Sequence, residues 1–404
     1  MDGAIKKRLF LWILLVPLMS GCSHQQTVKE QYPDWGEQIF LNSVQRTAPL
    51  HIRFLAPESP DGLRGCLLIV HGMNEYVGRY RHVVDYFADR FIIGGADFTG
   101  HGLTNPVLRQ AHEGIQAGAE DYDVSNAYLE QAQLRSLTPM REDLDQSLHY
   151  LIDRCDAVSG GKQLPVFILS HSLGSLVTAS YFLSSAQHNL AARVKGIIFT
   201  GPAFSVSEVP GWRGWFQTPL VRFSFHTHEH FLTTGHDEPL PLAVLNQLVA
   251  LIPVPLQDAI VELLSLPGIR AFVSPTTPDW VVEYLTDWED ERNRHRADNY
   301  IIRRTILRYV LGVEREIIRF RREMDKFDVP YLLIYSEFDP ITPAWGNTDF
   351  AAVTLDHHQD NEVMVLGSEN HHEQLFSSPP LRKHVLMKID EWLGRRLKVM
   401  ERGS

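Results

Sequence analysis

The chain has 404 residues, of which 44% are hydrophobic and 22% charged, a balance typical of globular proteins that excludes a disordered, collagen-like or coiled-coil one. Its 38 basic and 49 acidic residues give a net charge of −11, which disfavours nucleic acid and anionic lipid as direct partners. The length allows two or three domains, or one large α/β domain with an insertion.

Residues 1–21 have the pattern of a lipoprotein signal peptide, an export signal. Basic residues at positions 6–8 precede an apolar run at 9–19, which suits a signal peptide but is too short to span a membrane. The sequence that follows, LMSGC, resembles a bacterial lipobox, which implies that Cys22 becomes the lipidated first residue of the mature protein. With Ser23 after it, the resemblance implies an anchor in the bacterial cell envelope, at the outer membrane if the source is Gram-negative. An ordinary signal peptide and an uncleaved anchor are the alternatives.

Residues 22–36 are polar, and we expect them to form a tether between this anchor and the folded domain. Two cysteines remain beyond Cys22: Cys66 falls in an expected strand and Cys155 in an expected helix. Because two cysteines are too few for a scaffold built on disulfides, we expect both to be buried thiols.

Apolar runs alternate with amphipathic helical patterns along most of the chain. This alternation predicts an α/β fold, with a mostly parallel sheet covered by helices on both faces. The expected parallel strands are 66–70, 91–93, 166–169, 194–199, 331–335 and 363–366, with antiparallel edge strands at 38–41 and 51–55. The expected helices are 80–90, 141–154, 173–186, 343–354 and 381–398.

The strand that ends at residue 200 and the strand that begins at 331 are separated by far more than the dozen or so residues of a usual crossover. We therefore predict that residues 37–202 and 301–404 form the core domain and that residues 203–300 form an inserted helical cap. A long amphipathic helix at about 300–326 would return the chain to the core.

The segment LPVFILSHSLGS places Ser172 between an expected strand and an expected helix, with the small residues Ser170 and Gly174 two positions on either side. This spacing is typical of a nucleophile elbow, a turn too tight for bulky flanking side chains. A serine in that position needs an imidazole to accept its proton and a carboxylate to orient the imidazole.

Candidates for both groups follow later strands. Asp339 ends the strand at 331–335, and the adjacent His371 and His372 follow the strand at 363–366. The carboxyl ends of parallel strands are where open α/β sheets form their sites, so these residues can meet Ser172. Two backbone amides should complete an oxyanion hole: Leu173, directly after the serine, and Met73, after the strand at 66–70.

The motifs HGMNEYVGRY, DFTGHGLT, SHSLGS, SEFDPITP and NHHEQLF, in this order, resemble those of the α/β-hydrolase subfamily that contains monoacylglycerol lipases and bacterial lysophospholipases, of the serine aminopeptidase S33 type. The resemblance covers about residues 50–397 and implies an eight-stranded α/β-hydrolase sheet. It implies Ser172 as nucleophile, Asp339 as acid and His372 as base, because the family's histidine usually precedes a glutamate. Met73 and Leu173 would be the oxyanion donors. The chain departs from the family's motifs at Ser170, where a glycine is usual, and at Tyr76, where a histidine is common.

The resemblance implies hydrolysis of a lipid-derived carboxylic ester, such as a monoacylglycerol or lysophospholipid, through an acyl-serine intermediate, without a cofactor or metal. A non-lipid esterase, thioesterase or peptidase of the same fold is an alternative. The alternating histidines at 226–230 (HTHEH) leave open a metal-dependent hydrolase, whose activity a chelator would abolish. An inactive binding module would keep the fold without turning over esters.

Overall fold

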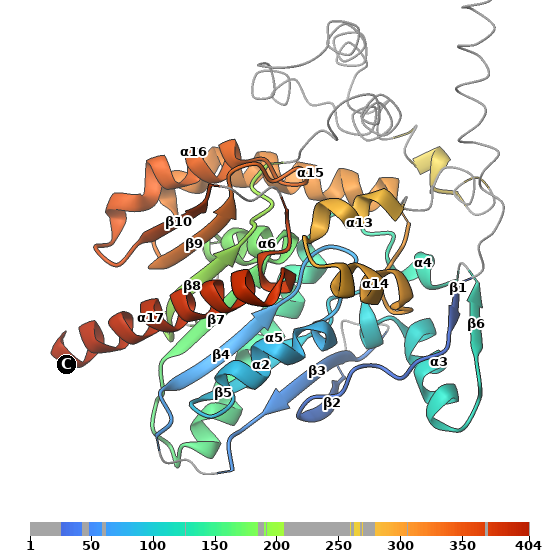
Figure 1. Ribbon diagram of the computed structural model, residues 1–404, viewed down its shortest axis with the longest axis horizontal. Helices are drawn as coiled ribbons and strands as arrows, with labels where there is room; N and C mark the ends of the chain where they lie inside the picture. Colours follow the sequence, from blue (N-terminus) through green and yellow to red (C-terminus); the bar gives the residue numbers. More distant parts are fainter. Residues whose placement is uncertain are drawn as a thin grey trace, which may run out of the picture.

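An eight-stranded sheet with helices on both faces forms the centre of the computed structural model (Figure 1). The structure describes residues 26–42, 48–58, 62–125, 127–184, 190, 192–205, 259, 262–266, 269, 279–304, 306–367 and 371–403. The sheet is mostly parallel, and the α/β-hydrolase fold expected from the sequence is confirmed.

The strands lie in the order β10-β9-β8-β7-β4-β5-β3-β2. Their bounds are β2 (Glu37–Leu41), β3 (Leu50–Leu55), β4 (Gly65–Val70), β5 (Phe91–Ala96), β7 (Val166–His171), β8 (Val194–Thr200), β9 (Tyr331–Ser336) and β10 (Glu362–Leu366). β3 is antiparallel to both of its neighbours, and the six strands from β10 to β5 are parallel. The chain order reverses at β4, and open α/β sheets bind their ligands outside the carboxyl ends of strands at such a point.

Helices bury both faces of this sheet, which explains its continuous apolar strands. Along β4, Leu67 and Ile69 pack in one core with α2 (Arg81–Phe87) and α17 (Pro379–Gly403). Leu68 and Val70 face the other core, to which the helices α5 (Thr138–Val158), α6 (Leu173–Phe182), α15 (Leu307–Glu323) and α16 (Ala344–Thr354) contribute. In Figure 1, α2 and α17 lie in front of the strands and α5 and α6 behind them.

Shorter elements complete the described chain. They are β1 (Gln26–Val28), η1 (Val77–Tyr80), η2 (Gly102–Thr104), α3 (Pro106–Gln116), β6 (Tyr122–Ser125), α4 (Tyr128–Gln131), α13 (Asp279–Leu285), α14 (Glu289–Ala297), η5 (Met324–Lys326), η6 (Leu355–His357) and η7 (Gln374–Phe376). No described helix is long and apolar enough to cross a bilayer.

The insertion between β8 and β9 is described in its last part. α13 and α14 precede α15, the helix predicted to return the chain to the core, and α15 begins at Leu307 rather than near residue 300. Residues 206–258, which make up much of the expected cap and include the histidines at 226–230, lie outside the described residues.

The prediction of two buried thiols is wrong. Cys66 in β4 and Cys155 in α5 form a disulfide, with their Cα atoms 6.5 Å apart and 89 positions between them in the sequence. Both residues are fully buried, as expected. The pairing could not be predicted from the sequence, because the two cysteines meet only when α5 packs across β4.

The folded domain begins earlier than predicted. β1 pairs antiparallel with β6, and Val28, Tyr32 and Trp35 are buried. The Tyr32 hydroxyl donates to Asp97 at 2.9 Å, and the Trp35 indole N–H donates to the carbonyl of Val77 at 3.3 Å. The predicted tether of residues 22–36 is therefore too long, because three large apolar side chains fix an otherwise polar segment to the core. Cys22 lies outside the described residues.

Candidate active site

Ser172 occupies a strained turn between β7 and α6. Its φ of 50° and ψ of −120° lie in a region that non-glycine residues rarely adopt. The turn brings α6 so close to β4 that a Cβ on Gly174 would lie 2.4 Å from the carbonyl oxygen of His71. Ser170 fits in place of glycine because its buried hydroxyl donates to the carbonyl of Ile198 at 3.1 Å. The backbone therefore presents Ser172 at the carboxyl edge of the sheet.

Asp339 lies in the turn after β9 and is 5% exposed. One carboxylate oxygen accepts the backbone N–H groups of Ile341 and Thr342 at 2.8 and 2.9 Å. The other accepts the Thr342 hydroxyl at 3.0 Å. The sequence analysis did not single out Thr342, although a hydroxyl residue three positions after the acid in DPIT is a signal for this local hydrogen bonding.

His372 connects the serine to the acid. Its Nδ1 is 2.8 Å from Asp339 Oδ2, and its Nε2 is 2.7 Å from Ser172 Oγ. Because the ionised carboxylate can only accept, Nδ1 carries the proton and the bare Nε2 faces the serine hydroxyl. The neighbouring His371 instead uses its backbone carbonyl to accept the Ser336 hydroxyl at 2.7 Å. The structure thus brings together Ser172, Asp339 and His372.

The electrostatics of this group suit proton transfer from serine. Burial alone would raise the pKa of Asp339, but the attraction of His372 and the backbone hydrogen bonds hold that pKa below its ordinary value. Burial alone would lower the pKa of His372, but the Asp339 carboxylate raises it above the ordinary value. Asp339 is therefore ionised near neutral pH and stabilises positive charge on His372.

The two expected oxyanion donors flank the serine. Leu173 begins α6, and the first N–H groups of a helix have no partner within the helix. Met73 follows Gly72, whose position is so close to Ser172 that an added Cβ would lie 3.0 Å from the serine Cβ. The Gly72 N–H donates to the Glu75 carboxylate at 2.5 Å, which holds this loop in its turn. We call residues 72–76 the oxyanion loop.

Among the described residues, no group of three or more His, Cys, Asp or Glu side chains is placed to hold a metal ion. The alternating histidines at 226–230 fall outside that part of the chain.

The sequence model of the family described as serine aminopeptidase, S33, matches residues 61–365, more than half of the chain. The chain belongs to this family. The match confirms the family expected from the motifs around Ser172, Asp339 and His372.

Solved structures of similar fold include lipases and an esterase. A soluble variant of monoglyceride lipase from Saccharomyces cerevisiae, in complex with a substrate analog, has a TM-score of 0.62 and 16% identity, covering 91% of this chain and 99% of that chain. The monoacylglycerol lipase of Paleococcus ferrophilus has a TM-score of 0.55 and 17% identity, covering 86% of this chain and 99% of that chain. A carboxyl esterase from Bacillus coagulans, in complex with glycerol, has a TM-score of 0.53 and 17% identity, covering 90% and 100%. At these identities the likeness shows the fold alone. No curated protein sequence matches the chain.

Proposed function

We propose that the protein hydrolyses carboxylic esters through an acyl-serine intermediate. The observation that supports this most strongly is the continuous hydrogen-bonded chain from Ser172 Oγ through His372 to Asp339. Such a chain lets a neutral imidazole accept the serine proton while a carboxylate stabilises the imidazolium that forms. The family match is to serine hydrolases, which agrees with this chemistry.

In this mechanism, Ser172 Oγ attacks the ester carbonyl carbon as His372 Nε2 accepts the hydroxyl proton. The carbonyl electron pair moves to the oxygen, which the N–H groups of Met73 and Leu173 would bind. When the carbonyl re-forms, the bond to the alkoxy group breaks and that group takes the proton from Nε2. A water molecule then repeats both steps on the acyl-serine, so that one ester and one water yield one acid and one alcohol.

We favour a lipid-derived ester, such as a monoacylglycerol or a lysophospholipid, as the substrate. Three observations support this choice: the motif resemblance, the lipases among the structural neighbours, and the lipobox-like LMSGC sequence. An enzyme anchored at Cys22 would meet monoacyl lipids that leave the same bilayer. Such an anchor would not bring the enzyme closer to a soluble ester.

A substrate panel tests the proposal. The purified protein in detergent would be assayed with monoacylglycerols and lysophospholipids of several chain lengths, a short soluble ester, a thioester and an aminoacyl amide. We expect turnover of the monoacyl lipids that a serine-directed phosphonate abolishes and a chelator leaves unchanged. Turnover of the amide alone would favour a peptidase, and loss of activity with the chelator would favour a metal-dependent hydrolase.

A further inference from the structure

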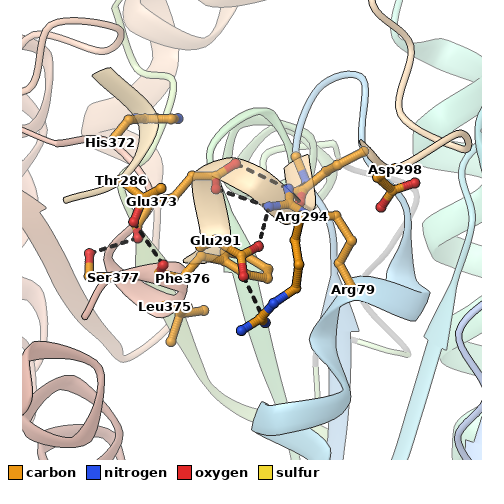
Figure 2. Close-up of polar contacts among 12 residues, drawn as sticks. Arg79, Thr286, Glu291, Arg294, Asp298, His372, Glu373, Leu375, Phe376 and Ser377 are labelled. Carbon is orange, nitrogen blue, oxygen red and sulfur yellow. Dashed lines mark hydrogen bonds and ion pairs between the residues drawn. The ribbon is translucent and has the colours of Figure 1, made fainter. Parts of the chain in front are cut away.

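A buried guanidinium lies beside the proposed site. The Arg79 side chain is 5% exposed, and its nitrogens contact three carboxylates, two of which, Glu291 and Glu373, are labelled in Figure 2. Glu75 lies at 2.7 Å, Glu291 at 3.1 Å, and the two oxygens of Glu373 at 3.1 and 3.0 Å. The ring of Phe376 packs against the guanidinium, with its centroid 4.2 Å from the central carbon. A cation with these partners is held in one position.

The three carboxylates belong to three different parts of the molecule. Glu75 lies in the oxyanion loop and accepts the Gly72 N–H. Glu373 directly follows His372 in the sequence. Glu291 lies on α14 of the insertion, 212 positions from Arg79. We call residues 371–376 the histidine loop. Arg79 therefore joins the oxyanion loop, the histidine loop and the insertion.

The insertion also binds the histidine loop through its backbone. We call residues 284–302, which run from the end of α13 to the residues after α14, the strap. The N–H groups of His372 and Glu373 donate to the carbonyls of Tyr284 and Leu285 at 3.0 and 2.7 Å. The Thr286 hydroxyl donates to the carbonyl of Phe376 at 2.9 Å. These bonds fix the backbone at His372 and in the residues that follow it.

The far end of the strap binds the oxyanion loop. The Ile302 N–H donates to the carbonyl of Asn74 at 2.9 Å, directly after Met73. The Tyr76 hydroxyl donates to the Asp298 carboxylate at 2.7 Å. One continuous segment of the insertion is thus bonded to the loops that carry the proposed base and one of the proposed oxyanion donors.

We propose that the strap, with Arg79 as its central contact, sets the position of His372 relative to the oxyanion loop, and that Arg79 and Glu291 are positioning residues for hydrolysis. This inference rests on the proposed function. Neither residue touches the reacting atoms of the proposed mechanism. Each acts through a loop that does, and a displacement of about 1 Å at such a loop can lower the rate about 100-fold.

The charge of Arg79 also acts on the carboxylates near His372. His372 faces the carboxylates of Asp339, Glu373 and Glu75, all of which raise its pKa, while the neutral His171 ring packs at 5.1 Å. Although burial opposes it, the attraction of Arg79 holds the pKa of Glu373 below its ordinary value.

The groups around Arg79 are Glu75, Glu291, Glu373, His295 and Asp298. Burial raises the pKa of Glu75 to about 7 even with Arg79 beside it, so without the guanidinium Glu75 and Glu373 would hold protons more readily. Loss of the cation would raise the pKa of His372 and loss of these negative charges would lower it, so the two changes oppose each other.

Steady-state kinetics of the full chain test the inference. Glu291→Gln removes the charge on α14 at nearly constant volume, and we expect kcat to fall about 10-fold or more with KM changed less than about threefold. Arg79→Met should lower kcat at least as much, again with little change in KM. Arg79→Lys should not restore kcat, because an ammonium group keeps the charge without the planar contacts.

Two exposed ion pairs supply matched controls. Glu289→Gln lies on the same helix as Glu291 and removes a 62% exposed carboxylate, and Arg81→Met removes a 60% exposed guanidinium beside η1. Both should keep the parent kcat and KM. Lower melting temperatures for the Arg79 and Glu291 variants, with parent kcat and KM, would overturn the inference in favour of a structural role. If Arg79→Met does not fold, Glu291→Gln and Arg79→Lys distinguish a positioning role from a structural one.

The rate at which a phosphonate labels Ser172 separates this inference from the proposed function. If the parent is labelled but turns over no ester, the proposed substrate class is wrong, and the labelling rates of the variants still test positioning. Slower labelling of Glu291→Gln than of Glu289→Gln would support the proposed role of the strap in positioning His372. Equal rates would contradict it, and a parent that is neither labelled nor active would overturn both proposals.

Discussion

His371 and His372 are adjacent in the sequence, but the ring that contacts both Ser172 and Asp339 is that of His372. His372→Ala should therefore lower kcat by about 10³-fold or more, because the serine loses its proton acceptor. His371→Ala should cost much less, since its backbone carbonyl, which remains in the variant, makes the hydrogen bond to Ser336. Steady-state assays of the two variants check this. The reverse order of activities would assign the base to His371.

The pH dependence of hydrolysis follows from the same pair. His372 acts as a base only when neutral, and Asp339 raises its pKa above the ordinary histidine value of about 6.5. Activity is therefore lost as the pH falls through this raised pKa. We expect the acid limb of kcat/KM to lie above pH 6.5 in the parent protein. An acid limb at or below this value would contradict the paired arrangement.

Ser172, Asp339 and His372 could be predicted because each lies at or just after the carboxyl end of an apolar strand, where local sequence reveals its place. Arg79 could not be predicted as part of the site. Its partners Glu291 and Glu373 lie 212 and 294 positions away, and no local pattern links them. Contacts of this kind depend on how the insertion packs, which periodicity does not reveal.

At the scale of elements, the strands were predictable because both faces of the sheet are buried and the resulting apolar runs are continuous. The pairing of Cys66 with Cys155 was not, since it depends on how α5 crosses β4. The start of the folded domain was also missed, because β1 is short and is held by β6, about 95 positions away in a polar part of the sequence.

The disulfide between β4 and α5 should contribute to stability. It closes a loop of 89 positions, and cross-links of this kind stabilise proteins by about 2 to 4 kcal/mol. We expect the double variant Cys66→Ala, Cys155→Ala to lose about this much free energy of unfolding while keeping its kcat, because neither sulfur lies in the proposed site. Denaturant unfolding in the absence of reductant measures it. An unchanged midpoint would indicate that the bond does not form in the protein.

At the scale of the whole molecule, the expected lipid anchor is close in the sequence to the start of the described domain. Residues 23–25 separate Cys22 from β1, and three residues span at most about 11 Å. An anchored enzyme would therefore hold the edge formed by β1 and β6 near the bilayer. The net charge of the full chain, −11, gives no attraction to anionic lipid.

Cys22→Ala tests the proposed anchor. The variant should appear in the soluble fraction or remain unprocessed, because it cannot receive acyl chains, and several chains are needed for stable anchoring. Cell fractionation with the parent as reference checks this. A variant that is processed and still fractionates with membranes as the parent does would contradict the lipoprotein proposal and remove one support for a lipid substrate.

The most direct test of a serine nucleophile is a comparison of Ser172→Ala with the parent protein in the same ester assay, with a phosphonate probe as second readout. We expect a folded variant, with the melting temperature of the parent, whose hydrolysis is lower by about 10³-fold or more. We also expect the probe to label Ser172 in the parent and nothing in the variant. Parent-like turnover by a folded Ser172→Ala protein would contradict the assignment of Ser172 as the nucleophile.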